Sequence, residues 1–386
     1  MRQILHIDIN SFFASCEQAV DETIRGKPVA VVSSIEGRNC ILLAVSYEAK
    51  DYGIKRTMSL KQAQSLCQNL ILRVANHNMY QHFSNKFIKI LCEYVPIVES
   101  TSIDEAYLDM TGTERLYGDI KEFAKKMQKM IYDRLLLPSS IGISDNKSLA
   151  KMASDYKKPM GITEFYSANI KKQVWPLSVD TLLGVGNKTL SNLQKLGIYT
   201  IGDLAIFDKT QLKIYLGENS SEMLHKLANG IDDSKVITYD KDSVKSIGKE
   251  ITFEEDVTSR DIIKRELLLM SENIATRLRK LDKRAKTVTL KIKYNNFTVI
   301  TRSHTLEDVF NTTNIIYKTA VELYIKQCIN TMPIRLVGVQ VSNIEKKDIK
   351  QMSLFTDKED EKNEKFEKSI DIIREKYGYN IIKRRI

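Results

Sequence analysis

The chain has 386 residues, of which 42% are hydrophobic and 28% charged, and it carries a formal net charge of +10. This length predicts roughly two to four domains, and the apolar content is high enough for buried cores, which excludes a disordered chain. The positive charge favours nucleic acid as a partner, although a basic surface that only aids solubility would give the same total.

Cysteine usage and the N-terminus indicate the cellular compartment. The five cysteines are widely spaced and include no C-x-x-C pair, which argues against a disulfide framework or a zinc site and fits a reducing environment. The apolar stretch at the N-terminus is broken by Asp8 and is too short for a signal peptide, and no long apolar run follows. We therefore expect a cytoplasmic protein with no membrane partner.

Residues 1–165 alternate between segments typical of strands and segments typical of helices. Strands are expected at 3–9, 27–33, 41–46 and 141–143, and helices at 11–20, 47–52, 59–67, 77–94, 120–135 and 147–155. Residues 97–109 indicate two further strands that meet near Asp104. This alternation predicts an α/β unit.

The rest of the chain changes character twice. Short helices are expected up to about residue 235, then a charged linker, and then strands that alternate with two longer helices up to residue 343. In 287–294, Val288, Leu290 and Ile292 alternate with lysines, as in a strand with one buried face. The tail after 346 is highly charged, and a last helix is expected around Phe366, Ile370 and Ile373.

Three acidic residues are candidates for a metal site. Asp8 ends an apolar strand, and Asp104 and Glu105 lie together where two strands meet. An acid at the end of a buried strand is costly unless it is paired or binds a cation. Carboxylates from two strands could hold two divalent ions about 3.5–4 Å apart, and Mg²⁺ prefers such oxygen ligands. The sequence therefore predicts a two-metal site for phosphoryl transfer.

The adjacency of Asp104 and Glu105 imposes a geometric condition on that prediction. Neighbours in a regular strand point to opposite faces, so both can reach one site only if a turn or bulge breaks the alternation there. The alternative is that these residues are solvated acids in a surface turn.

Five segments carry a resemblance to a known family. They are HIDINSFFASCEQ (6–18), AVSYEAKDYGIK (44–55), STSIDEAYLDMT (100–111), GISDNKSLAKMASDYKKPMGI (142–162) and LLGVGNKTLSNLQKLGI (182–198). In this order they resemble the Y-family DNA polymerases, and most of all the bacterial members. Each segment alone is a weak signal, but the ordered set is specific.

The resemblance implies a right-hand polymerase, a multidomain fold of α/β and α+β parts. The palm would comprise 1–10 and 76–166, the small fingers 11–75, the helix–hairpin–helix thumb 167–235, the linker 236–246, the α+β little finger 247–346, and a charged tail 347–386.

The resemblance also implies roles at the active site. Asp8 and Asp104 would bind the metals, with help from the carbonyl of Ile9, and Glu105 would complete the shell of the catalytic ion. The cofactor would be two Mg²⁺ ions, for which Mn²⁺ can substitute.

A second group of residues is implied to bind the incoming dNTP. Phe13 would be the steric gate that excludes a ribose 2′-OH, although a core aromatic on an amphipathic helix would show the same pattern. The backbone amides of Phe12 and Phe13 would hold phosphate together with Tyr47, Lys50 and Lys158.

Two positions depart from the family pattern. Lys50 stands where the family usually has Arg, and this exchanges a two-pronged grip on phosphate for a point charge. Asn10 stands where the family often has Asp, and we expect little catalytic effect because Asp8 is the implied ligand.

DNA contacts are expected on the thumb and little finger. Gly184 and Gly186 form the hairpin of LLGVGNKTL, where backbone amides approach a phosphate without Cβ obstruction, and Lys188 follows. Arg279, Lys291 and Lys293 belong to a basic cluster that could neutralise phosphates, or that could be only a solvated face.

The tail contains a short apolar island, QMSLF (351–355). It resembles the clamp-binding peptide of bacterial polymerases, so Gln351, Leu354 and Phe355 would enter a pocket on the sliding clamp.

The sequence thus predicts a monomeric, template-directed and error-prone polymerase that binds primer–template DNA and acts in translesion synthesis without proofreading. Two alternatives remain: another two-metal enzyme on a similar palm, such as a nucleotide cyclase, or a non-catalytic DNA-binding scaffold.

Overall fold

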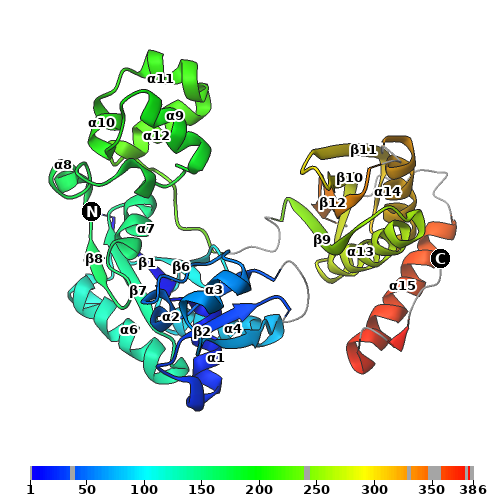
Figure 1. Cartoon of the computed structure of the whole chain (residues 1–386), viewed down its shortest axis with the longest axis horizontal. Coiled ribbons are helices and arrows are strands. Elements are labelled where there is room, and N and C mark those ends of the chain that lie inside the picture. The colour runs from blue at the N-terminus through cyan, green and yellow to red at the C-terminus, as the bar shows by residue number, and fades with distance from the viewer. Residues whose placement is uncertain are drawn as a thin grey trace. The chain divides into compact units, whose positions relative to one another are not determined.

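The computed structural model describes residues 2–34, 40–238, 244–327, 332–346, 358–378 and 381–382. The chain separates into two compact units, Met1–Tyr239 and Asp240–Ile386 (Figure 1). No helix in the described ranges is long and apolar enough to cross a membrane.

The first unit is built on a five-stranded sheet in the order β5–β6–β1–β7–β8. Its strands are β1 (Ile4–Ile9), β5 (Val98–Ser100), β6 (Glu105–Asp109), β7 (Ser139–Ser144) and β8 (Ile162–Glu164). The central strand β1 is buried throughout and pairs antiparallel with both β6 and β7. Its side chains therefore alternate between two covered faces.

Helices cover both faces of this sheet (Figure 1). On one face, Leu5, Ile7 and Ile9 join a core with α4 (His77–Tyr94) and α6 (Ile120–Leu135). On the other face, α7 (Lys147–Tyr156) packs closely on β1 and β7. A Cβ at Gly142 of β7 would lie 1.9 Å from the carbonyl oxygen of Ala150 on α7, so the close packing of α7 requires glycine there.

A smaller three-stranded sheet, in the order β3–β2–β4, follows β1 in sequence. Its strands are β2 (Val29–Val32), β3 (Leu42–Val45) and β4 (Ile71–Val74), and its helices are α1 (Phe12–Val20), η1 (Glu22–Ile24), α2 (Tyr47–Lys50) and α3 (Leu60–Leu66). Ala30, Val32 and Leu42 belong to a separate small core. Helix α3 begins with a capping box between Ser59 and Gln62, which satisfies its first backbone donors.

Short helices make up residues 167–228. They are η2 (Ser167–Asn169), α8 (Ile170–Gln173), η3 (Val179–Thr181), α9 (Asn187–Lys195), α10 (Ile201–Ile206), α11 (Lys209–Leu216) and α12 (Glu218–Ala228); a short α5 (Glu114–Tyr117) lies earlier in the chain. Their core includes Leu193, Ile201 and Leu224 and continues into Leu149 and Met152 of α7.

The second unit is a sheet in the order β11–β10–β12–β9 covered by two helices. Its elements are β9 (Ser246–Val257), α13 (Arg260–Lys280), β10 (Lys283–Tyr294), β11 (Val299–Phe310), α14 (Thr313–Gln327), β12 (Ile334–Ser342) and β13 (Glu345–Lys346). Val288, Leu290 and Ile292 of β10 are buried against the helices, as their alternation predicts.

Helix α15 (Lys358–Tyr377) packs on the second unit mainly through charged residues. Arg279 of α13 is paired with Glu367 and Asp371, and Arg374 is paired with Glu272. A helix is present around Phe366, Ile370 and Ile373, as predicted; of these side chains Ile370 is 7% exposed, whereas Phe366 is 63% exposed and Ile373 39%. Buried ion pairs, rather than an apolar stripe, orient this helix.

Candidate active site

Asp8 and Glu105 lie directly opposite each other in the antiparallel pair of β1 and β6. Cross-strand partners share one face of a sheet, so both carboxylates point to the side covered by α7. Asp8 is 6% exposed. A carboxylate at this depth requires compensating charge or hydrogen bonds.

Asp104 precedes β6, which begins at Glu105. Residues 102–104 form a bend, so the break in alternation that the sequence requires is present. The backbone N–H of Ile9 donates to the carbonyl of Asp104 (3.0 Å), which ties the bend to the end of β1. The Asp104 carboxylate accepts a 2.6 Å hydrogen bond from Ser102 Oγ.

Two lysine ammonium groups neutralise the carboxylates. Lys151 Nζ on α7 lies 3.0 Å from Asp8 Oδ2 and 2.5 Å from Glu105 Oε1. Lys158 Nζ lies 2.8 Å from Asp8 Oδ1 and 2.7 Å from Asp155 Oδ1. Asp8 therefore has a cation on each of its oxygens.

The protonation of this cluster follows from its burial. Burial raises the pKa of Glu105 to about 7, and the hydrogen bond to Asp8 adds to the effect, while Lys151 opposes it. Burial also acts to raise the pKa of Asp8, but the hydrogen bond with Glu105 and the charges of Lys158 and Lys151 outweigh it and lower that pKa. Asp8 is thus the stronger acid of the pair.

The cluster fits a divalent cation in its chemistry. Within the described ranges, no three Asp, Glu, His or Cys side chains are arranged as a ready metal-binding set. In this structure Lys151 pairs with Asp8 and Glu105, Lys158 pairs with Asp8, and Asp104 bonds Ser102. The donors are nevertheless all carboxylate oxygens, the type that Mg²⁺ prefers, and they already attract positive charge.

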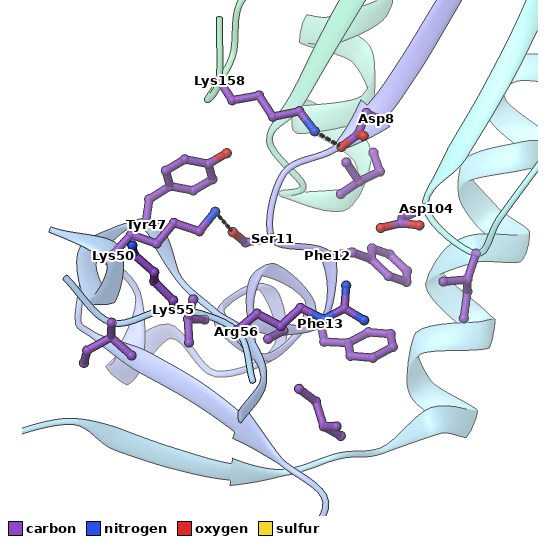
Figure 2. Close-up of a pocket in the computed structure, with 16 residues that line it drawn as sticks. Asp8, Ser11, Phe12, Phe13, Tyr47, Lys50, Lys55, Arg56, Asp104 and Lys158 are labelled. Atoms are coloured by element: carbon purple, nitrogen blue, oxygen red, sulfur yellow. Dashed lines mark hydrogen bonds and ion pairs between the residues drawn. The ribbon is translucent and has the colours of Figure 1, made fainter. Parts of the chain in front are cut away.

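A cavity of about 500 Å³ opens beside Asp8 and Asp104 (Figure 2). Its walls include Ile9, Ser11, Phe12, Phe13, Leu43, Ala44, Val45, Tyr47, Lys50, Ile54, Lys55, Arg56, Ile103 and Lys158. Figure 2 shows Asp8 and Lys158 together at one end and Phe13 with Arg56 at the other. The cavity is large enough for a small-molecule ligand.

Phe13 lies in this wall with its ring held in place. It stacks on Tyr80 of α4 at 4.3 Å between ring centroids and 14° between planes, and His77 contacts its edge. The Phe12 side chain is instead buried in the core. Both residues belong to the first turn of α1, whose N-cap, Ser11, has left-handed backbone angles and forms no side-chain cap. Those first backbone N–H groups are therefore suited to an anion.

A cationic wall faces Phe13 across the cavity. Lys50 Nζ donates to Ser11 Oγ at 2.9 Å and lies 3.7 Å from the ring centroid of Tyr47 (Figure 2). Burial, with the nearby charge of Lys158, lowers the pKa of Lys50. Lys158 lines the same cavity, so the three side chains predicted to bind dNTP, those of Tyr47, Lys50 and Lys158, converge on it.

Asn10 holds the loop that carries Lys158. It is 1% exposed, its Oδ1 accepts from the N–H of Met160 at 2.9 Å, and its Nδ2 donates to Ser140 Oγ at 3.0 Å. The Asn10 side chain thus accepts through Oδ1 and donates through Nδ2, whereas an ionised carboxylate in its place could only accept.

Sequence reasoning missed several residues of this site, among them the polar Ser11, Lys55, Arg56 and Lys151. A partial signal existed for Lys151, because Lys151 and Asp155 are four residues apart in the expected helix 147–155 and so lie on one side of it. Nothing in the sequence indicated Ser11, whose left-handed conformation is a tertiary feature.

The residues expected to contact DNA divide into two groups. Gly184 has a φ of +93°, Gly186 is the N-cap of α9 without a side-chain cap, and Lys188 is exposed, so this hairpin leaves backbone amides accessible. The element before the hairpin is the single turn η3 rather than a full helix. Lys291 forms a partly exposed pair with Glu250, and Lys293 lies over Phe297.

Arg279 does not fit a DNA contact. Its side chain is 4% exposed, and its guanidinium is paired with Glu367 and Asp371. A buried guanidinium that already has two carboxylate partners is not available to a phosphate. Gln351, Leu354 and Phe355 lie outside the described residues.

Known proteins match this chain over 99% of its length. The impB/mucB/samB family model matches residues 7–155, the C-terminal domain model of the same family matches 244–354, and a model described as the DNA polymerase-iota thumb domain matches 180–232. DNA polymerase IV of Clostridium kluyveri is 40% identical over 99% of this chain and 97% of its own length. The chain belongs to the Y family of DNA polymerases.

Two further proteins agree with this membership. DNA polymerase IV 1 of Bacillus subtilis is 39% identical over 99% of this chain and 92% of its own length. A solved Y-family DNA polymerase chimera has the same fold, with a TM-score of 0.78 and 22% identity over 89% of this chain and 99% of the other. The parts of this Y-family chain are therefore a palm, fingers, a thumb and a little finger.

Proposed function

We propose that this chain, a DNA-directed DNA polymerase, extends a primer along its template at the cavity beside Asp8, with Asp8, Asp104 and Glu105 as the ligands of two Mg²⁺ ions. The observation that carries the proposal is the register of β1 and β6, which sets Asp8 opposite Glu105 and leaves Asp104 on the cavity wall. The family implies dependence on divalent metal in general; Mg²⁺, with Mn²⁺ as a substitute, follows from the all-oxygen donor set.

The residues around the cavity divide the work. Bound divalent ions would activate the primer 3′-hydroxyl and neutralise the leaving pyrophosphate. Tyr47, Lys50 and Lys158, with the amides at the start of α1, hold the triphosphate. Phe13 lies at the other end, where its ring, fixed against Tyr80, excludes a ribose 2′-OH.

Low fidelity follows from the character of the cavity wall. Leu43, Ala44 and Val45 of β3 line the cavity and have apolar side chains, so they supply no side-chain hydrogen bonds to test base-pair geometry. A wall of this type tolerates altered bases, which supports a role in translesion synthesis and repair. We propose that the enzyme acts without its own proofreading.

DNA would be held through its backbone. Gly184, Gly186 and Lys188 of the thumb and Lys291 and Lys293 of the little finger offer amides and ammonium groups, which bind phosphates without reading sequence. We further propose that the enzyme acts as a monomer in the cytoplasm and binds the sliding clamp through Gln351, Leu354 and Phe355. Alanine at these three positions should abolish pull-down by purified clamp without changing primer extension in its absence.

The deciding assay measures product formation from nucleotides with and without primed template. Asp8→Asn, Asp104→Asn and Glu105→Gln should each lower kcat by at least about 100-fold, because each removes charge that stabilises the transition state. DNA affinity should stay near that of the unaltered protein. Asp133→Asn, on an exposed acid of α6, is the control. Full activity in the Asp104 variant would refute the assignment, and product formation without primed template would favour a cyclase.

A further inference from the structure

Lys151 is the cation of the carboxylate cluster that the proposed chemistry leaves without a role. It lies on α7 with its side chain 18% exposed, and its ammonium reaches Asp8 Oδ2, Glu105 Oε1 and, at 3.3 Å, Asp155 Oδ2. It thus bridges two of the three proposed metal ligands from the palm side of the site.

Lys151 and Lys158 differ in what can displace them. Of the two, only Lys158 is among the described residues that line the cavity, so an arriving triphosphate can draw it away from Asp8. Lys151 approaches from α7, the helix packed on the sheet face that carries Asp8 and Glu105. Only an ion that enters between the carboxylates takes the place of its ammonium.

We propose that Lys151 is a tethered counterion: it holds Asp8 and Glu105 together when no divalent ion is bound, and it competes with the first ion to enter. This inference rests on the proposed function of the same cluster. Lys151 is a positioning residue in this scheme, because it contacts the metal ligands rather than the substrate.

The physical basis is the cost of leaving two facing carboxylates uncompensated. Two like charges a few ångströms apart in a partly desolvated site repel strongly, and an ammonium between them relieves that repulsion. A divalent ion does the same more effectively, but it must first displace the lysine. Both cations cannot occupy one bridging position, so the lysine lowers the apparent affinity for the ion.

Asp155 gives the displaced ammonium somewhere to go. It is one helical turn beyond Lys151, its side chain is 48% exposed, and it already lies within 3.3 Å of Lys151 Nζ. A flexible lysine stem can therefore move its charge towards Asp155 without losing every partner. This makes the exchange reversible and explains why Asp155 lies beside the ligands.

Mn²⁺ binding without nucleotide or DNA tests the proposal. Free Mn²⁺ is measured by electron paramagnetic resonance for the full chain, Lys151→Met, Lys151→Arg and a control, Lys147→Met. Lys147 lies one turn earlier on α7, is 15% exposed, and pairs with Glu99 at 2.7 Å. It matches Lys151 in helix, burial and pairing, but it contacts none of the proposed ligands.

Lys151→Met should bind Mn²⁺ at least roughly tenfold more tightly than the unaltered chain, since a positive charge has left the position. Its melting temperature without ions should fall, and Mn²⁺ should raise it by more than it raises that of the control. Lys151→Arg, which keeps the charge, should stay near the unaltered affinity. Equal or weaker Mn²⁺ binding by Lys151→Met would overturn the proposal.

Two further variants keep the outcome interpretable. Asp155→Asn removes the alternative partner, so it should weaken Mn²⁺ binding; tighter or unchanged binding would count against the exchange even if Lys151→Met failed to fold. Asp8→Asn tests the site itself. If Mn²⁺ binding is unchanged in Asp8→Asn, the assigned metal site is wrong. If binding is lost in Asp8→Asn but is unaffected by Lys151→Met, only the counterion proposal is rejected.

Discussion

Lys50 Nζ donates a hydrogen bond to Ser11 Oγ. Ser11 is the N-cap of α1 and Lys50 is the last residue of α2, so this bond joins the two helices that are proposed to hold the triphosphate. Lys50 also lies over the ring of Tyr47. The ammonium is therefore held at one position of the cavity wall before any ligand arrives.

Replacing Lys50 with Arg tests what the family difference means. A guanidinium can grip a phosphate with two parallel hydrogen bonds, whereas an ammonium acts as a point charge. Lys50→Arg should lower KM for dNTP by roughly three- to tenfold, which corresponds to about 1 kcal/mol, with little change in kcat. Steady-state single-nucleotide insertion measures this, with Lys55→Arg in the same cavity as the control. An unchanged or higher KM would show that Lys50 is not a phosphate ligand.

Phe13 should control sugar selection. Phe13→Ala removes the ring that is stacked on Tyr80, so the space for a 2′-OH becomes available. The preference for dNTP over rNTP should fall by at least about 100-fold, or roughly 2.7 kcal/mol. Insertion kinetics with matched dNTP and rNTP measure the ratio. Phe13→Tyr keeps the ring and should retain the preference; an unaltered ratio in the alanine variant would remove the steric-gate role.

The lysines of β10 should contribute to DNA affinity through charge alone. Lys293→Gln should weaken binding of unrelated duplexes equally and reduce the slope of log affinity against log salt by about one. Fluorescence anisotropy at several salt concentrations gives both values. Lys326→Gln, on an exposed residue of α14 paired with Glu322, is the control. A loss that depended on DNA sequence would contradict a backbone contact.

The thumb should lose stability in acid through one helix start. Backbone N–H bonds from Thr200 and Tyr199 lower the pKa of Asp203, which completes the capping box of α10. A lowered pKa gives stability that is present above the ordinary value of 3.8 and is lost as pH falls below it. Asp203→Asn should lower the melting temperature at neutral pH by roughly 2–4 °C.

The same comparison at low pH completes that test. The difference between Asp203→Asn and the unaltered chain should shrink as pH falls below 3.8 and through the lowered pKa of Asp203, because both then carry a neutral side chain. Asp208, which caps α11, offers a second acid on the thumb for comparison. A difference that stays constant with pH would exclude a role for the charge.

The features of the site that the sequence predicted are those set by local chemistry. Asp8 is conspicuous because an acid ends an apolar strand, and the break before Glu105 is required by strand geometry. Both are visible without a structure. The proposed dNTP-binding residues were predicted from the family resemblance rather than from spacing, and the structure brings Tyr47, Lys50 and Lys158 to one cavity.

The features that the sequence did not predict depend on which surfaces meet. The spacing of Lys151 and Asp155 indicates a shared helix face, but only the packing of α7 shows that this face meets Asp8 and Glu105. Arg279 looked like a solvated cation because its partners, Glu367 and Asp371, lie about 90 residues later in the chain. Long-range charge pairing leaves no periodic signal, whereas an apolar face does.

The docking of α15 affects how the C-terminal region can be studied. A truncation after residue 346 would remove Glu367 and Asp371, break their ion pairs with Arg279, and uncover the part of the second unit on which α15 packs. A shortened protein that is inactive could then be misfolded rather than merely unable to make the proposed clamp contact. Genetic dissection of this region therefore calls for point substitutions that spare the helix, because a stop codon would remove a structural part of the little finger together with the peptide.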